Sequence, residues 1–119
     1  MRQRSAFQIS AAILGIHGLV EVGGPIAFLA APSLVGLLFP ENTWFFVSIG
    51  VIWGATRLAA AAGILKMKKW AVALGITLEI ATFVVAASLV PFGIIDMALA
   101  APVLALLFYA WFGSEKLSA

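Results

Sequence analysis

The sequence contains no cysteine and a single histidine among its 119 residues. Without cysteine, disulfide bonds, thiolate metal sites and cysteine nucleophiles are excluded, and the redox environment of the protein cannot be read from the chain. Charged residues are also scarce, at 10% of the chain, with seven basic and five acidic side chains. Seven basic residues are too few to build the extended basic face that nucleic-acid binding requires.

Hydrophobic residues, in contrast, make up 64% of the chain, and its mean hydropathy is +1.15. A soluble domain is typically about half apolar and about a quarter charged. The composition therefore excludes both a water-soluble globule and a disordered chain. Together with the short length, it predicts a single integral membrane domain over residues 1–119.

Four stretches are apolar and long enough to cross a bilayer as helices, at about 7–31, 44–65, 70–90 and 93–112. Each spans about the 20 residues that a transmembrane helix needs. Transmembrane strands would alternate polar and apolar residues, and the run from Leu58 to Leu65 shows no such alternation. The sequence therefore predicts an all-α, four-helix transmembrane bundle.

The connections between these spans differ in character. Those at residues 66–69 and 90–93 are short, so the helices that they join are expected to be antiparallel neighbours. The segment 32–40 reads PSLVGLLFP, which is too apolar for an aqueous loop. A single straight helix over 7–39 would be about 50 Å long, more than a bilayer holds. We therefore expect a bend, followed by a short interfacial or re-entrant segment at 33–39.

The basic residues are predicted to gather at one end of the bundle. Arg57 is the exception, and the other six are Arg2, Arg4, Lys66, Lys68, Lys69 and Lys116. By the positive-inside rule this end faces the cytoplasm, so both termini are expected inside, in the plasma membrane of a prokaryote. Anionic lipid head groups are expected to gather near Lys66, Lys68 and Lys69.

Aromatic residues fit the same orientation, because tryptophan and tyrosine favour the membrane–water boundary. Trp44 and its two phenylalanine neighbours mark the predicted outer boundary, while Trp70, Tyr109 and Trp111 mark the inner one. Almost no chain lies outside the four spans. Any protein partner is therefore expected to bind through helix faces or the lysine loop, as a second copy of this chain or as helices of another membrane protein.

Four ionisable residues fall inside the first three predicted spans: His17, Glu21, Arg57 and Glu79. A charged side chain at mid-membrane costs about 2.5–3.5 kcal/mol on insertion scales, so each requires a partner or a function. Counted from the inner end of each span, His17, Arg57 and Glu79 lie at nearly the same depth. We therefore predict one intramembrane site for ions or substrate, built from these four residues.

Small residues surround Arg57 at helical spacing. Gly50, Trp53, Gly54 and Arg57 share a stripe on the second span. The Gly50-x-x-x-Gly54 pattern permits close approach of a neighbouring helix. Trp53 lies one turn from Arg57, where its ring is expected to face the guanidinium group.

Three further residues are expected to support or flank the site. Pro25 has no N–H to bond the carbonyl of Glu21, which predicts a local helix break, and broken helices often mark ion sites in transporters. Thr82 shares a helix face with Glu79. Asp96 is interpreted as a capping or solvated acid at the start of the fourth span, with an outer-face gate as the alternative.

The charged residues admit a structural and a functional interpretation. Arg57 paired with one glutamate would fix the register of two helices. The second glutamate must then be protonated, paired with His17, or charged and available to a cation. This excess of acids favours exchange of protons or cations over a purely structural role.

Metal binding and catalysis receive little support. His17, Glu21 and Glu79 could supply three metal ligands, but one histidine makes this a minor alternative. Ser10 lies two turns from His17 and lacks flanking glycines, so no activated nucleophile is indicated. We expect no cofactor, no metal and no catalytic residue.

The general plan of four spans with a glutamate in the first resembles the small multidrug resistance transporters. The resemblance covers this plan and Glu21, and it implies binding of a cation at that glutamate. Arg57 and the one-sided basic residues depart from that family, so we assign none. The leading hypothesis is a homo-oligomeric transporter or channel-like protein for protons, cations or a small charged solute. The alternative is an accessory or lipid-interacting membrane protein whose buried charges only fix helix packing.

Overall fold

The computed structural model describes residues 2–31, 33, 43–88, 93–113 and 117–118. Its helices are α1 (Gln3–Ala30), α3 (Thr43–Leu65), α4 (Lys69–Ala87) and α5 (Ile94–Trp111). All four are long and apolar enough to cross a membrane. The predicted all-α fold with four membrane-length helices is therefore confirmed. The expected interfacial or re-entrant segment lies, from residue 34 onward, outside the described residues.

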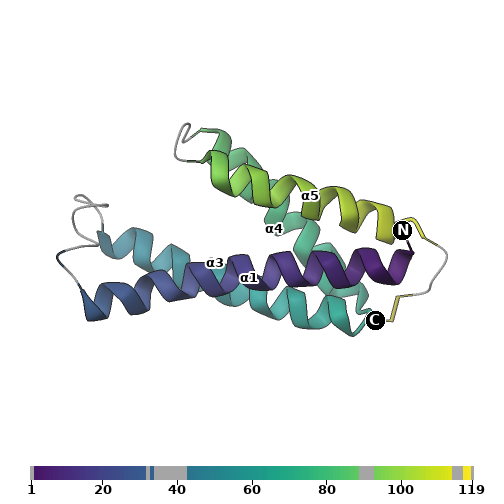
Figure 1. The fold of residues 1–119 in the computed structure, drawn as a ribbon, viewed down its shortest axis with the longest axis horizontal. Coiled ribbons are helices and arrows are strands. Elements are labelled where there is room, and N and C mark those ends of the chain that lie inside the picture. The colour runs from purple at the N-terminus through teal and green to yellow at the C-terminus, as the bar shows by residue number, and fades with distance from the viewer. Residues whose placement is uncertain (1, 32, 34–42, 89–92, 114–116, 119) are drawn as a thin grey trace.

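Around the bundle the helices follow the order α1, α3, α4, α5, and each packs mainly against its two neighbours. α1 therefore lies between α3 and α5, and α4 lies between the same two helices on the opposite side. Figure 1 shows that the α1–α3 pair and the α4–α5 pair lie close together at the end that holds both chain termini. The two pairs diverge towards the other end.

The apolar core occupies the half of the bundle nearest the chain termini. Its fully buried side chains come from all four helices and include Phe7, Leu14, Ile64, Val72 and Leu107. Among the described side chains, none beyond residue 18 of α1 is buried, and none of α3 before residue 54 is buried. The terminal half is thus close-packed, whereas the opposite half leaves more of its helix surfaces uncovered.

The turn after α3 fixes the terminal end of the bundle. The N–H of Lys68 donates to the carbonyl of Gly63 at 3.0 Å, and that of Met67 donates to Ile64 at 2.9 Å. With Met67 in the left-handed region (φ 58°), these bonds form a Schellman motif that ends α3 and leads directly into α4. Ser118 donates its N–H to the Met67 carbonyl at 3.0 Å, which holds the C-terminal residues against this turn.

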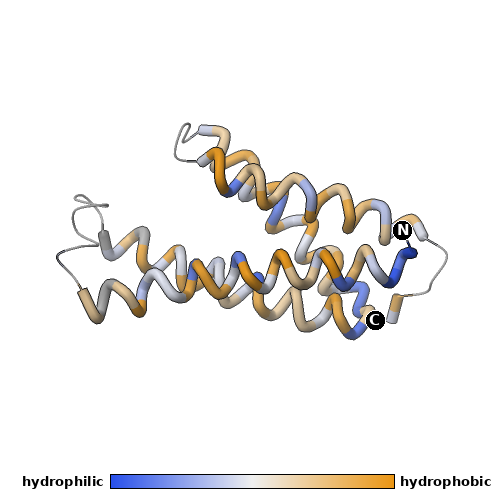
Figure 2. The backbone as a smooth tube through the Cα atoms, in the orientation of Figure 1, coloured by the Kyte–Doolittle hydropathy of each residue, from blue (hydrophilic) through white to orange (hydrophobic). Residues whose placement is uncertain are grey.

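Most hydrophilic positions lie at this same end (Figure 2), and a few lie within the otherwise apolar helices. The side-chain amide of Gln3 donates to the carbonyl of Ala110 at 2.7 Å, so the start of α1 lies against the end of α5. The basic residues Arg2, Arg4 and Lys66 therefore share one end of the molecule with both chain termini. That this end faces the cytoplasm stays a prediction from the positive-inside rule.

α1 and α3 approach each other closely where two glycines face each other. A Cβ atom on Gly54 would lie 2.7 Å from the carbonyl oxygen of Gly18, and one on Gly18 would lie 2.9 Å from that of Gly54. One turn away on α3, a Cβ on Gly50 would lie 3.2 Å from the carbonyl oxygen of Glu21. Both glycines of the Gly50-x-x-x-Gly54 pattern thus face α1, as expected for a small-residue helix contact.

We expect Gly54→Ala to lower the free energy of unfolding by about 1–3 kcal/mol, because the added methyl group has to displace the α1 backbone. Thermal unfolding in detergent micelles, followed by circular dichroism, measures the change. Gly24→Ala is the matched control, because a Cβ there meets nothing within 4 Å. If both variants unfold at the wild-type temperature, the close contact of α1 and α3 is wrong.

Candidate functional site

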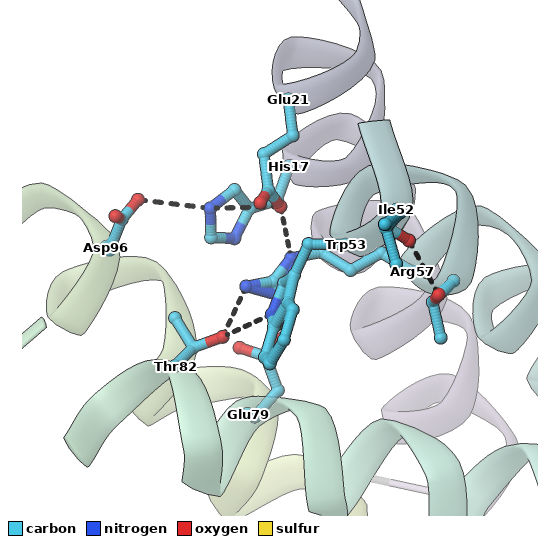
Figure 3. A network of polar contacts seen from close by, with 9 residues as sticks. His17, Glu21, Ile52, Trp53, Arg57, Glu79, Thr82 and Asp96 are labelled. Atoms are coloured by element: carbon cyan, nitrogen blue, oxygen red, sulfur yellow. Dashed lines mark hydrogen bonds and ion pairs between the residues drawn. The ribbon is translucent and has the colours of Figure 1, made fainter. Parts of the chain in front are cut away.

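Arg57 is the centre of a cluster of polar side chains inside the bundle, which we call the buried polar network (Figure 3). The arginine is 1% exposed, and it lies one turn along α3 from Gly54. Its Nε donates to the carboxylate of Glu21 on α1, and its Nη1 donates to Oε1 of Glu79 on α4 at 2.8 Å. Its Nη2 donates to the hydroxyl of Thr82, also on α4. One side chain thus joins three helices.

Trp53 extends the network from the same face of α3. Its indole Nε1 donates to the hydroxyl of Thr82 at 3.1 Å, so this hydroxyl accepts from both the indole and Arg57. Trp53 therefore contacts the network through its N–H. Among the described residues, the cation–π contact that is present joins Lys69 to Trp111 and does not involve Trp53.

His17 connects the network to the fourth helix. Its Nε2 lies 3.1 Å from Oδ1 of Asp96 on α5 and 3.7 Å from Oε1 of Glu21. The histidine is buried, whereas 53% of the Asp96 side chain is exposed. Asp96 lies in the first turn of α5, whose N-cap residue is Gly93, and its carboxylate contacts His17 on α1.

The interpretation of Asp96 as an acid at the exposed start of the fourth span agrees with its place in the first turn of α5 and its 53% exposure, and the contact with His17 is an addition to it. The place of Asp96 beside His17 follows from the packing of α5 against α1. The sequence indicates this place in one way. Asp96 is the third residue of the fourth helix, which begins at the same end of the bundle at which the first helix ends. That indication becomes useful only once α1 and α5 are known to be neighbours.

Glu79 is the most deeply buried acid of the network, with no exposed surface. Its Oε1 accepts the hydrogen bond from Arg57, and its Oε2 has no hydrogen-bond partner among the described residues. A buried polar atom of this kind is costly, and it usually indicates a bound water, a proton or a functional constraint.

The charges of the network do not balance. Among the described residues it contains three carboxyl groups, on Glu21, Glu79 and Asp96, against one arginine and one histidine. Even with a protonated His17, two positive charges face three negative ones. The sum reaches zero only when a carboxyl group holds a proton or when a cation binds. Net charge within a membrane is costly, so this excess favours such binding.

The structure brings together all the residues that the sequence assigned to the ion or substrate site, namely His17, Glu21, Arg57 and Glu79, and both polar supporting residues, Trp53 and Thr82. Pro25 lies outside these contacts. The expected helix break there is wrong, because α1 continues through Pro25 to Ala30.

The metal alternative finds no support in the geometry. Within the described part of the chain, no group of three or more histidine, cysteine, aspartate or glutamate side chains is arranged to hold a metal ion. The hydroxyl of Ser10 donates to the carbonyl of Ala6 at 2.7 Å.

The buried polar network thus draws side chains from all four helices and has an exposed edge at Asp96. Its components are an arginine, a histidine and an excess of carboxyl groups, which can bind and exchange protons or small cations. Comparisons of the chain with descriptions of protein families, with curated proteins and with solved structures found no match.

Proposed function

We propose that this protein is a small membrane transporter or channel-like protein, and that the buried polar network is the site where it binds and releases protons. The observation that carries the proposal is the excess of carboxyl groups around Arg57. A network built only to join helices would need one acid for this arginine, whereas here Glu21 and Glu79 both bind it and Asp96 joins through His17.

The side chains of the network differ in exposure, and in this proposal protons enter at the most exposed of them, Asp96. The side chain of Asp96 is 53% exposed and that of Glu21 is 21% exposed, whereas His17 and Glu79 are buried. A proton taken up by Asp96 has Nε2 of His17 at 3.1 Å as its next acceptor. The same nitrogen lies 3.7 Å from Glu21, so a small shift of the ring passes the proton on without a ring flip.

The proposed pathway would have to continue from the network to the end with the chain termini. Between the network and the end with the chain termini lie fully buried apolar side chains, among them Leu14, Ile64 and Leu107. Conduction across the membrane therefore requires a second conformation in which this core is hydrated or shifted. Such a second conformation is what alternating access would require of the proposed transporter.

A second candidate function, that of an accessory membrane subunit, is favoured by one observation. All three guanidinium nitrogens of Arg57 have acceptors within the chain, as a structural ion cluster requires. In that case the network only fixes helix packing, and its carboxyl groups do not exchange protons.

Proton flux into liposomes tests the proposed function. Purified protein is reconstituted with a pH-sensitive dye inside the vesicles, and a potassium gradient with valinomycin makes the interior negative. Wild-type vesicles are expected to acidify several times faster than protein-free vesicles. Asp96→Asn is expected to slow this flux several-fold, because it removes the exposed carboxylate that first takes up protons. Wild-type flux equal to that of protein-free vesicles would contradict the proposal.

A further inference from the structure

A second polar feature lies at the end of the bundle that holds the chain termini. A hollow of about 160 Å³ opens there between the start of α1 and the end of α3, far along both helices from the buried polar network. It is lined by Arg4, Phe7, Gln8, Ile64, Leu65 and Met67. Its volume is about ten times what a single water molecule needs, so it can hold a small polar group.

The lining has two chemical halves. Phe7 and Ile64 are fully buried and form an apolar floor, whereas Arg4 and Gln8 are exposed at the polar rim. Among the described residues the lining contains no acidic side chain, and a guanidinium group matches the geometry of a phosphate. From this combination we propose that the hollow binds the head group of an anionic phospholipid.

The apolar half of the hollow favours a lipid over a free phosphate ion. Leu65 lines the hollow and is 61% exposed, so an apolar surface continues from the floor to the outside of the helix pair. A glycerol backbone and the start of an acyl chain can pack along this surface. A free phosphate would use only the polar rim.

The position of the hollow fits the boundary of a membrane. Arg4 lies in the first turn of α1 and Leu65 is the last residue of α3, so the hollow lies at the ends of two membrane-length helices. At the same end, half-exposed Trp70 and Tyr109 supply the aromatic residues that favour head-group depth.

Lys69 and Lys66, two lysines at this end, have different surroundings. Lys69 lies 5.8 Å from the ring centroid of Trp111, which ties it to α5. Lys66 is exposed and stands between the two lining residues Leu65 and Met67. We therefore assign the lipid contact to Arg4, with Lys66 beside it, rather than to the lysine cluster as a whole. This assignment is independent of proton transport.

Native mass spectrometry of the protein in detergent, titrated with phosphatidylglycerol or phosphatidylcholine of identical acyl chains, tests the proposal. We expect the wild-type protein to retain phosphatidylglycerol several times more than phosphatidylcholine. Arg4→Gln is expected to lower phosphatidylglycerol binding about tenfold, because it removes the charge-assisted hydrogen bonds to the phosphate.

Arg2→Gln is the matched control, because it removes the same charge two residues away from an exposed position outside the lining. It is expected to leave binding nearly unchanged, and thermal unfolding checks that both variants are folded. Equal losses in the two variants would overturn the site in favour of diffuse attraction by the basic end. Equal retention of the two lipids, or displacement of the lipid by inorganic phosphate, would also overturn it.

Discussion

Arg57→Met is expected to destabilise the bundle by about 3–5 kcal/mol, because it leaves buried carboxyl groups without their positive partner. Methionine approximates the length of the arginine side chain, so the loss does not come mainly from an empty space. Glu21 and Glu79 would lose their charge-assisted hydrogen bonds, and Thr82 would lose one of its two donors. Denaturant or thermal unfolding in detergent micelles measures the effect.

A variant without the ion pairs of Arg57 separates electrostatics from packing. Combining Glu21→Gln, Arg57→Met and Glu79→Gln removes both partners of each ion pair that Arg57 forms, and it is expected to recover most of the stability that Arg57→Met loses. Buried ion pairs behave in this way because the unpaired charge is what costs most. Wild-type stability of Arg57→Met would show that the two glutamates do not depend on Arg57 for neutralisation.

Glu79→Gln is expected to reduce proton flux in liposomes to the level of protein-free vesicles while leaving the bundle folded. The glutamine oxygen can still accept the bond that Arg57 donates to Oε1, and Glu21 still neutralises the arginine. An amide cannot take up or release the proton that a carboxyl group exchanges at this depth. The dye assay described above measures the flux, and thermal unfolding confirms the fold.

Thr77→Val is the matched control for this variant. Thr77 lies on the same helix and is exposed, and its hydroxyl donates to the carbonyl of Ala73 one turn earlier. Its substitution is expected to leave flux unchanged. If Glu79→Gln conducts like the wild type, Glu79 is not an exchange group. If Glu79→Gln and Glu21→Gln change only the unfolding temperature and not the flux, the result supports the function as an accessory membrane subunit.

Hydropathy and helix geometry predict much of this molecule. Long apolar runs require helices in a bilayer, because every backbone polar group has to be satisfied within the chain. The constant rise of a helix then places His17, Arg57 and Glu79 at one depth before any packing is known. The glycine spacing at Gly50 and Gly54 predicts the close contact that lets Arg57 reach Glu21.

The remaining features depend on which helices are neighbours and on how side chains are turned. Short connections place α4 beside both α3 and α5. They do not decide that α5 also packs against α1. Asp96 could therefore not be placed beside His17 from the sequence. The indole of Trp53 could equally face Arg57 with its ring or reach Thr82 with its N–H. At Pro25 the helix continues, because membrane helices tolerate a missing backbone hydrogen bond.

Infrared difference spectroscopy of the reconstituted protein tests most directly whether the buried polar network exchanges protons. Between mildly acidic and mildly alkaline buffer, we expect the C=O band of a protonated carboxyl group to lose intensity, and we expect it to shift in D₂O. Glu79→Gln is expected to remove this component, whereas Thr77→Val keeps it. Identical difference spectra for the wild type and Glu79→Gln would contradict proton exchange at Glu79 and would leave the network as a fixed ion cluster that holds the helices together.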